Sequence, residues 1–112
     1  MSAKRPRALG VIPARMGSTR FPGKPLALLR GMPMIWHVWK RSILARSLDA
    51  VVIATCDEAI RRAAESFGAK VVMTSSKHTR ANDRVAEACA RIPCDVVLNI
   101  QGDEPLVDPR LI

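Results

Sequence analysis

Short apolar runs rich in β-branched residues constrain most strongly what this chain can fold into. They span residues 9–14, 50–55 and 96–100, and a shorter run of the same kind spans 70–74. None alternates between apolar and polar residues, which is typical of parallel strands that helices cover on both faces. We therefore expect four buried strands.

Helical patterns fill the intervals between these runs. Apolar residues recur every three or four positions within 35–43, 60–67 and 85–92, as on one face of an α-helix. The alternation of strand and helix predicts an α/β domain with a mostly parallel sheet and helices on both faces. A length of 112 residues fits one such domain.

Capping residues indicate where these helices begin and end. Asp57 is predicted to cap the second helix, and Gly68 to follow its last turn. Asn82 or Asp83 is predicted to cap the third. Asp108, followed by a proline, has the pattern of a further helix start, so we expect the chain to be truncated, the first part of a larger domain.

Positive charge is concentrated in the first half of the chain. Residues 1–50 carry ten Lys or Arg and one acidic residue, a net of +9, whereas residues 51–112 carry eight against nine, a net of −1. This imbalance indicates an anionic partner. A basic nucleic-acid-binding module is one alternative, but only 4% of residues are aromatic, so stacking platforms are scarce and we expect no nucleic-acid partner.

Cysteine usage and hydropathy indicate the cellular setting. Cys56, Cys89 and Cys94 are an odd number without a Cys-x-x-Cys pair, which argues against a disulfide framework and a zinc site. We therefore expect a cytoplasmic protein. No run approaches the ~18 consecutive apolar residues of a membrane helix, so no membrane insertion is expected.

The loop after the first strand, residues 13–25, is the segment richest in chemistry. It lies where ligands bind in open α/β sheets, beyond the carboxyl end of a strand. Glycines, hydroxyls and fixed positive charge together are what a polyphosphate needs. A basic surface loop with turn glycines is the alternative. The contributing residues are Arg15, Gly17, Ser18, Thr19, Arg20, Gly23 and Lys24.

Two common nucleotide motifs do not describe this loop. Five residues rather than four separate Gly17 from Gly23, and Pro25 stands where a Walker A loop has Ser or Thr. The pattern also differs from Gly-x-Gly-x-x-Gly, which excludes the dinucleotide fingerprint.

Polar residues follow two further strands. Asp103 is the candidate Mg²⁺ ligand, because a carboxylate after a glycine at a strand end commonly holds this ion against phosphates. Gln101 would point to the same side, and a capped turn is the alternative reading of this segment. The stretch from Thr74 to His78 could recognise a base or a sugar, and His78 could equally be an ordinary loop histidine.

Packing roles are assigned to Trp36, His37, Trp39 and Cys56.

Taken together, these segments resemble the 3-deoxy-manno-octulosonate cytidylyltransferases, also called CMP-KDO synthetases. The likeness extends from about Val11 to Pro105. Its first segment alone is shared in outline with cytidylyltransferases that act on sialic acids. The matching segments are 13–15, 18–20, 22–26, 33–38, 54–57 and 99–105.

The resemblance implies a Rossmann-like nucleotide-diphospho-sugar transferase fold, with residues 1–112 as the N-terminal nucleotide-binding part of a single cytidylyltransferase domain. It implies Mg²⁺-dependent transfer of CMP from CTP to an acidic eight-carbon sugar, with release of pyrophosphate, for lipopolysaccharide precursor synthesis. A homodimer is implied for the full-length protein, and the short chain is expected to be inactive alone. The implied residues are Arg15, Lys24 and Asp103 for catalysis; Ala14, Arg15, Ser18, Arg20, Lys24, Thr74 and His78 for the nucleotide; Gln101 and Arg84 for the sugar; and Asp103 for the metal.

One segment departs from the family pattern. Where the family usually shows His-x-Ser-Gly-Thr-Asp-Arg, residues 78–84 read His-Thr-Arg-Ala-Asn-Asp-Arg. Ala81 cannot adopt a positive φ as cheaply as glycine, so a different loop shape is expected. The choice among 3-deoxy-manno-octulosonate, an amino-substituted octulosonate and a sialic acid therefore stays open.

Overall fold

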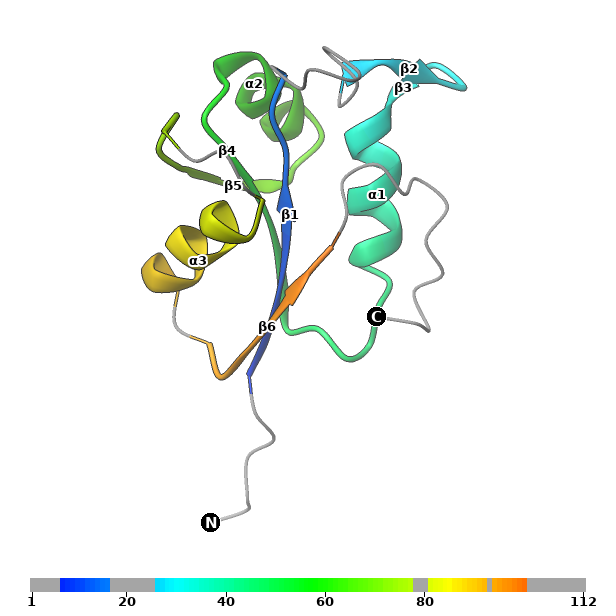
Figure 1. Cartoon of the computed structure of the whole chain (residues 1–112). Coiled ribbons are helices and arrows are strands. Elements are labelled where there is room, and N and C mark those ends of the chain that lie inside the picture. The colour runs from blue at the N-terminus through cyan, green and yellow to red at the C-terminus, as the bar shows by residue number, and fades with distance from the viewer. Residues whose placement is uncertain (1–6, 17–25, 78–80, 93, 101–112) are drawn as a thin grey trace.

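In the part of the chain that the structure describes, four parallel strands form the central sheet. The computed structural model describes residues 7–16, 26–77, 81–92 and 94–100. The strands are β1 (Ala8–Pro13), β4 (Ala50–Thr55), β5 (Lys70–Met73) and β6 (Val96–Asn99), and their order across the sheet is β5-β4-β1-β6 (Figure 1). All three pairings are parallel, because a helix-containing crossover separates each pair of strands along the chain.

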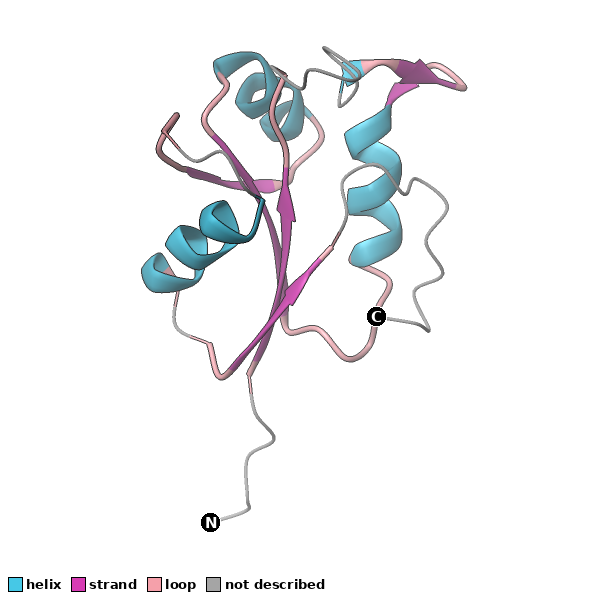
Figure 2. Ribbon diagram, in the orientation of Figure 1, coloured by secondary structure: helices cyan, strands magenta, loops and turns pink. Residues whose placement is uncertain are grey.

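The helices of the described ranges cover the two faces of this sheet: α1 (Met34–Ser42), α2 (Glu58–Ser66) and α3 (Ala81–Arg91) (Figure 2). Ile12 of β1 and Ile53 of β4 belong to a core cluster with residues of α1 and α2. Their neighbours Val11 and Val52 belong to a second cluster with Val85 and Ala88 of α3. Successive side chains of a strand point to opposite faces, so α1 and α2 lie on one face and α3 on the other.

These elements confirm the predicted α/β architecture and the four strand positions. The prediction for the end of α2 is also confirmed: Gly68 has a φ of +88°. Its N–H donates to the carbonyl of Glu65 at 3.1 Å, and the N–H of Ala69 donates to the carbonyl of Ala64 at 3.1 Å. This is the Schellman arrangement, which needs a left-handed residue just after the helix.

The predicted cap of the third helix was wrong. Helix α3 begins at Ala81, so Asn82 and Asp83 lie inside its first turn. An acidic side chain there interacts favourably with the helix dipole instead of capping the helix. Ala81 has helical backbone geometry, and Arg30 is the only non-glycine residue with a positive φ in the described ranges. Alanine is therefore unstrained at position 81.

A small antiparallel hairpin, which the sequence did not predict, precedes α1. It pairs β2 (Leu28–Leu29) with β3 (Met32–Pro33). Arg30 and Gly31, with φ of 53° and 83°, form the turn, as in two-residue hairpin turns that need positive φ at both positions. The ring nitrogen Nε2 of His37 lies 2.6 Å from the carbonyl oxygen of Leu29, which fits the structural role predicted for His37.

Candidate functional site

The carboxyl ends of the four parallel strands meet at one edge of the sheet, toward the top of Figure 1. Arg15 follows β1, Asp57 follows β4, Thr74 follows β5 and Ile100 follows β6. Parallel α/β sheets bind ligands beyond this edge. The sheet topology therefore places the starts of all the predicted functional segments together.

The chain leaving β1 is fastened to the end of β4. Ala14 is buried, and its N–H donates to the carbonyl of Ala54 at 2.9 Å. The next anchor is Asp57, whose Oδ2 accepts the N–H of Met16 at 2.8 Å. Between these two anchored positions, the side chain of Arg15 is exposed. The backbone on both sides of this cation is thus fixed while the side chain remains accessible to an anion.

Asp57 stands at the N-cap position of α2, as predicted, but its side chain makes no capping hydrogen bond. Its own N–H instead donates to the hydroxyl of buried Thr55 at 3.1 Å, and its carboxylate bonds to the chain that leaves β1. Sequence reasoning missed this positioning role because the partner, Met16, lies 41 residues away. The available signal was an acidic residue directly after a buried strand that neighbours the loop-bearing one.

On the other side of the sheet, α3 holds the loop that follows β5. Arg84 is only 3% exposed, and its guanidinium donates to the hydroxyl of Thr74 and, at 3.5 Å, to the carbonyl of Ser75. The Oε1 of Glu87 accepts the N–H of Ser75 at 3.0 Å. A buried guanidinium needs such partners, because an uncompensated buried charge is costly.

This network brings together two of the predicted site residues, Thr74 and Arg84. Arg84 is almost entirely buried. Its observed contacts, with Thr74 and Ser75, hold the loop in shape. The sugar contact that the resemblance implies for Arg84 stays a prediction. The remaining candidates lie outside the described residues, namely Ser18, Arg20, Lys24, His78, Gln101 and Asp103.

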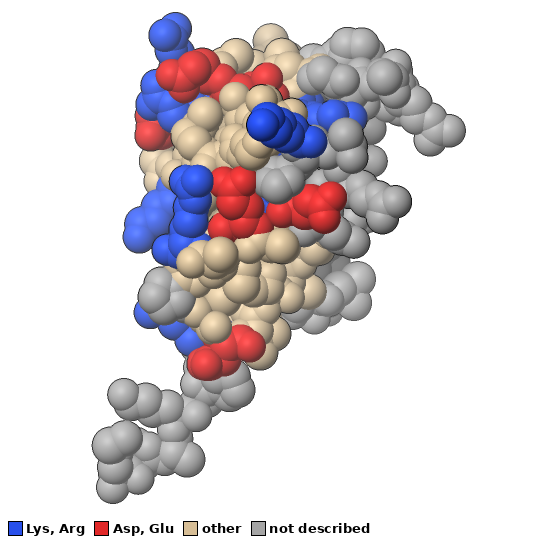
Figure 3. All heavy atoms as spheres, turned by 60° about the vertical axis from the view of Figure 1, so that its left-hand side comes forward, with Lys and Arg blue, Asp and Glu red and all other residues tan. Residues whose placement is uncertain are grey.

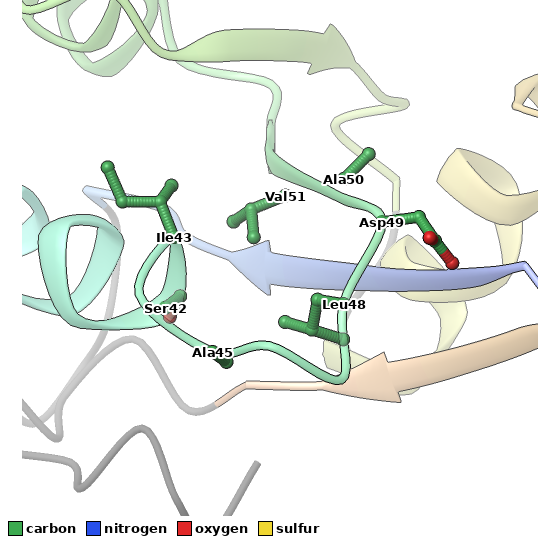
Figure 4. A pocket seen from close by; sticks show the side chains of 7 residues that line it. All are labelled: Ser42, Ile43, Ala45, Leu48, Asp49, Ala50 and Val51. Carbon is green, nitrogen blue, oxygen red and sulfur yellow. The ribbon is translucent and has the colours of Figure 1, made fainter.

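A pocket of about 140 Å³ lies at the opposite end of the sheet, where the chain passes from α1 into β4 (Figure 4). Its lining is mostly apolar, and the carboxylate of Asp49 there accepts the N–H of Ala8 at 2.7 Å. Asp49 is thus committed to holding the start of β1. We interpret the pocket as a gap in the packing beside Leu48, away from the candidate site.

Charge is mixed on the face of the molecule shown in Figure 3. Basic and acidic side chains are interspersed there, next to an uncharged area. Cations of α2 are paired in this way, because Arg61 donates to Glu65 at 2.7 Å and also to Glu58. Over the described residues, this face shows no continuous basic surface of the kind typical of duplex binding.

Two further observations concern metals and membranes. No group of three or more His, Cys, Asp or Glu side chains suited to a metal occurs within the described ranges, and the candidate ligand Asp103 lies outside them. Within the same ranges, no helix has the length and apolar character needed to cross a bilayer.

The sequence profile of the cytidylyltransferases matches residues 9–112. The chain belongs to this family. A 3-deoxy-manno-octulosonate cytidylyltransferase of Myxococcus xanthus is 56% identical over 95% of this chain and 44% of its own length. An 8-amino-3,8-dideoxy-manno-octulosonate cytidylyltransferase of Shewanella frigidimarina is 53% identical over 88% of this chain and 42% of its own.

A solved structure of CMP:2-keto-3-deoxy-manno-octonic acid synthetase complexed with CTP superposes on the chain with a TM-score of 0.90. The two share 42% identity over 93% of this chain and 43% of that one. This match confirms the Rossmann-like nucleotidyltransferase fold and the resemblance to the KDO cytidylyltransferases. The chain spans about 40% of the length of the curated relatives that it matches.

Proposed function

We propose that the protein is a cytidylyltransferase that transfers CMP from CTP to 3-deoxy-manno-octulosonate and releases pyrophosphate. The observation that carries the proposal is the 42% identity and TM-score of 0.90 with a synthetase solved in complex with CTP. Curated relatives with this activity in their names are 48–56% identical to the chain. Because the chain spans less than half of their length, the proposal concerns the activity of the complete gene product.

The nucleotide end of the proposed site is built on β1. Arg15 would bind the triphosphate with its exposed guanidinium, and the anchored backbone on both sides would limit the loss of freedom on binding. Ser18, Arg20 and Lys24 would add a hydroxyl and two further cations. Fixed cations stabilise the negative charge that develops on the leaving pyrophosphate, which is the main source of catalysis in this proposal.

The loop after β5 would form the far side of the site. Its backbone is held by Arg84 and Glu87, and the N–H of Thr74 donates to the carbonyl of Thr55 at 2.9 Å. A rigid loop can discriminate between bases or sugars by shape. We propose that Thr74 and His78 contact the nucleotide, and that Gln101 and Arg84 act on the sugar side.

We propose Mg²⁺ as the cofactor, with the carboxylate of Asp103 as one of its ligands. The N–H of Ile100 donates to the carbonyl of Val11 at 2.9 Å, so the chain leaves β6 at the same edge as the loop after β1. Asp103 follows three residues later, and a carboxylate oxygen is a ligand that Mg²⁺ prefers. Held there, the ion would neutralise phosphate charge and lower the pKa of the attacking hydroxyl.

A second sugar has specific support. The relatives named for 8-amino-3,8-dideoxy-manno-octulosonate are 52–53% identical to the chain, as similar as many of those named for the unsubstituted sugar. The chain also departs from the usual family pattern at residues 80–82. The 8-amino sugar is therefore the second candidate substrate.

Pyrophosphate release by the complete gene product tests both points. The four common nucleoside triphosphates would each be assayed with Mg²⁺ and either octulosonate. We expect turnover with CTP well above that with the other three. Turnover with ATP or GTP equal to that with CTP would contradict the proposal, whereas a preference for the 8-amino sugar would only change the assigned substrate.

A further inference from the structure

Two of the three cysteines lie in contact at the end of α3. The Sγ atoms of Cys89, in the last turn of the helix, and Cys94, in the loop before β6, are 3.4 Å apart. Both side chains are half-buried and both thiols are free. The third cysteine, Cys56, lies at the opposite end of the sheet, after β4.

The protein core and the chain that follows hold Cys94 in place beside α3. Cys94 packs against the cluster that contains Val85 and Ala88 of α3, so it lies on the same face of the sheet as the helix. The following residue, Asp95, is fixed to β1: its N–H donates to the carbonyl of Arg7, and its carboxylate accepts the N–H of Arg7 at 2.7 Å. The contact between the thiols is therefore built into the fold.

A disulfide needs sulfur atoms about 2.0 Å apart, so the two atoms would have to approach by only about 1.4 Å. Partial burial raises the pKa of the Cys94 thiol, and the contact with Cys89 raises it further. A raised pKa slows oxidation of this thiol, because the thiolate is the reactive form.

We propose that Cys89 and Cys94 are a redox-responsive pair that closes to a disulfide by exchange with a small-molecule disulfide such as oxidised glutathione. One cysteine thiolate attacks the glutathione disulfide, which forms a mixed disulfide and releases one glutathione thiolate. The second cysteine thiolate attacks the sulfur of the first and releases the second glutathione. The two protein thiols lose two electrons, oxidised glutathione gains them, and the two protons pass to the released glutathione thiolates.

Closing this bond would tie the C-terminal end of α3 to the chain that enters β6. The same helix carries Arg84 and Glu87, which hold the loop after β5. Oxidation would therefore act on the helix that shapes one side of the proposed site, although the pair itself lies outside that site.

The test is equilibration of the native chain and a Cys56→Ser variant in glutathione redox buffers, followed by alkylation and peptide mapping. We expect loss of two alkylatable thiols and a peptide that contains Cys89 and Cys94 two hydrogen masses lighter, with Cys56 still alkylated in the native chain. Cys89→Ser and Cys94→Ser should stop at the mixed disulfide with glutathione. Two thiols that remain alkylatable, or a bond that involves Cys56 or a second chain, would overturn the proposal.

A comparison with the unfolded chain makes the test independent of how the variants fold. In concentrated urea the fold no longer holds the two sulfurs in contact. The equilibrium constant for the 89–94 disulfide in the native chain should exceed that in urea by at least about tenfold, which corresponds to a reduction potential ~30 mV lower. Equal constants would mean that the fold does not favour the bond, and the proposal would fail.

Discussion

The carboxylate of Asp57 holds the backbone of Met16, through an N–H to Oδ2 hydrogen bond of 2.8 Å between the ends of β4 and β1. Two other aspartates hold β1 in the same way at its opposite end, since Asp49 accepts the N–H of Ala8 and Asp95 that of Arg7, each at 2.7 Å. Only the bond of Asp57 lies beside the proposed triphosphate site. Removing these bonds one at a time therefore distinguishes an effect on stability from an effect on ligand binding.

Asp57→Ala should weaken both stability and CTP binding. Loss of the carboxylate leaves the N–H of Met16 without its partner, which should lower the free energy of unfolding by about 1–2 kcal/mol. Asp57→Asn keeps an acceptor oxygen and should recover part of both losses. Urea denaturation and calorimetric titration with CTP are the measurements.

Asp49→Ala is the matched control, because it removes an equivalent bond to β1 away from the site. It should lower stability by no more than Asp57→Ala does, because the bond of Asp49 is the more exposed of the two, and it should leave the dissociation constant for CTP unchanged. If Asp49→Ala and Asp57→Ala weaken CTP binding equally, Asp57 has no specific role at the site.

Arg84→Met should destabilise the protein and disturb the loop after β5. Methionine preserves much of the side-chain volume but supplies no donor for Thr74 or Ser75, so the buried hydroxyl of Thr74 loses its partner. We expect a loss of about 2–3 kcal/mol in the free energy of unfolding. Arg91→Met, at the exposed end of the same helix, should cost much less because surface ion pairs contribute little. Similar losses from both variants in thermal or urea denaturation would contradict the importance assigned to the buried contacts.

The parts of the fold that depend on local periodicity were predictable from the sequence. Residues 50–55 and 9–14 could be assigned as strands because unbroken β-branched runs need no knowledge of their partners. The hairpin of β2 and β3 was not predicted, because strands of two residues have no detectable period. The contact of Arg84 with Thr74 was not predictable for another reason: it depends on how α3 packs on the sheet, and neither residue alone indicates the pairing.

Lys24→Ala and Asp103→Asn test the proposed catalytic residues in the complete gene product. Lys24→Ala should cost about 2–4 kcal/mol in transition-state stabilisation, seen as a fall in kcat/KM for pyrophosphate release. Asp103→Asn keeps the shape of the side chain but loses its charge, so it should chiefly raise the Mg²⁺ concentration needed for activity. Lys40→Ala, an exposed lysine on α1, should have no effect. Near-normal rates for both test variants at saturating Mg²⁺ would place the site elsewhere.

Gly10→Ala should overpack the face of β1 that is covered by α1 and α2. An added Cβ would lie 2.7 Å from Cδ1 of Leu48 and 2.9 Å from Cδ1 of Ile100. Because Leu48 lines the pocket of Figure 4, its side chain has room to move, and the loss should lie near the lower end of the usual range of about 1–3 kcal/mol. Leu48→Val combined with Gly10→Ala should relieve part of it in urea denaturation. Strict additivity of the two changes would show that Leu48 is not the obstacle.

The 112-residue chain should self-associate through β6 and should not turn over CTP. β6 is the outer strand at one side of the described sheet, and it exposes Val96 and Leu98, at 50% and 36%, on the same face. An apolar strand at a sheet edge favours pairing with another chain. Sedimentation of the chain at several concentrations would measure association, and pyrophosphate release with CTP and sugar would measure turnover.

Two charge substitutions make the test specific to this edge. Leu98→Lys should shift the chain toward the monomer, because a lysine on an edge strand disfavours pairing. Leu44→Lys replaces a leucine that is 62% exposed in the loop after α1, so it should leave association unchanged. Equal effects of the two lysines would indicate nonspecific apolar association in place of pairing through β6. A concentration-independent monomer with the turnover of its full-length relatives would contradict the prediction altogether, because the sugar pocket would then have to lie within residues 1–112.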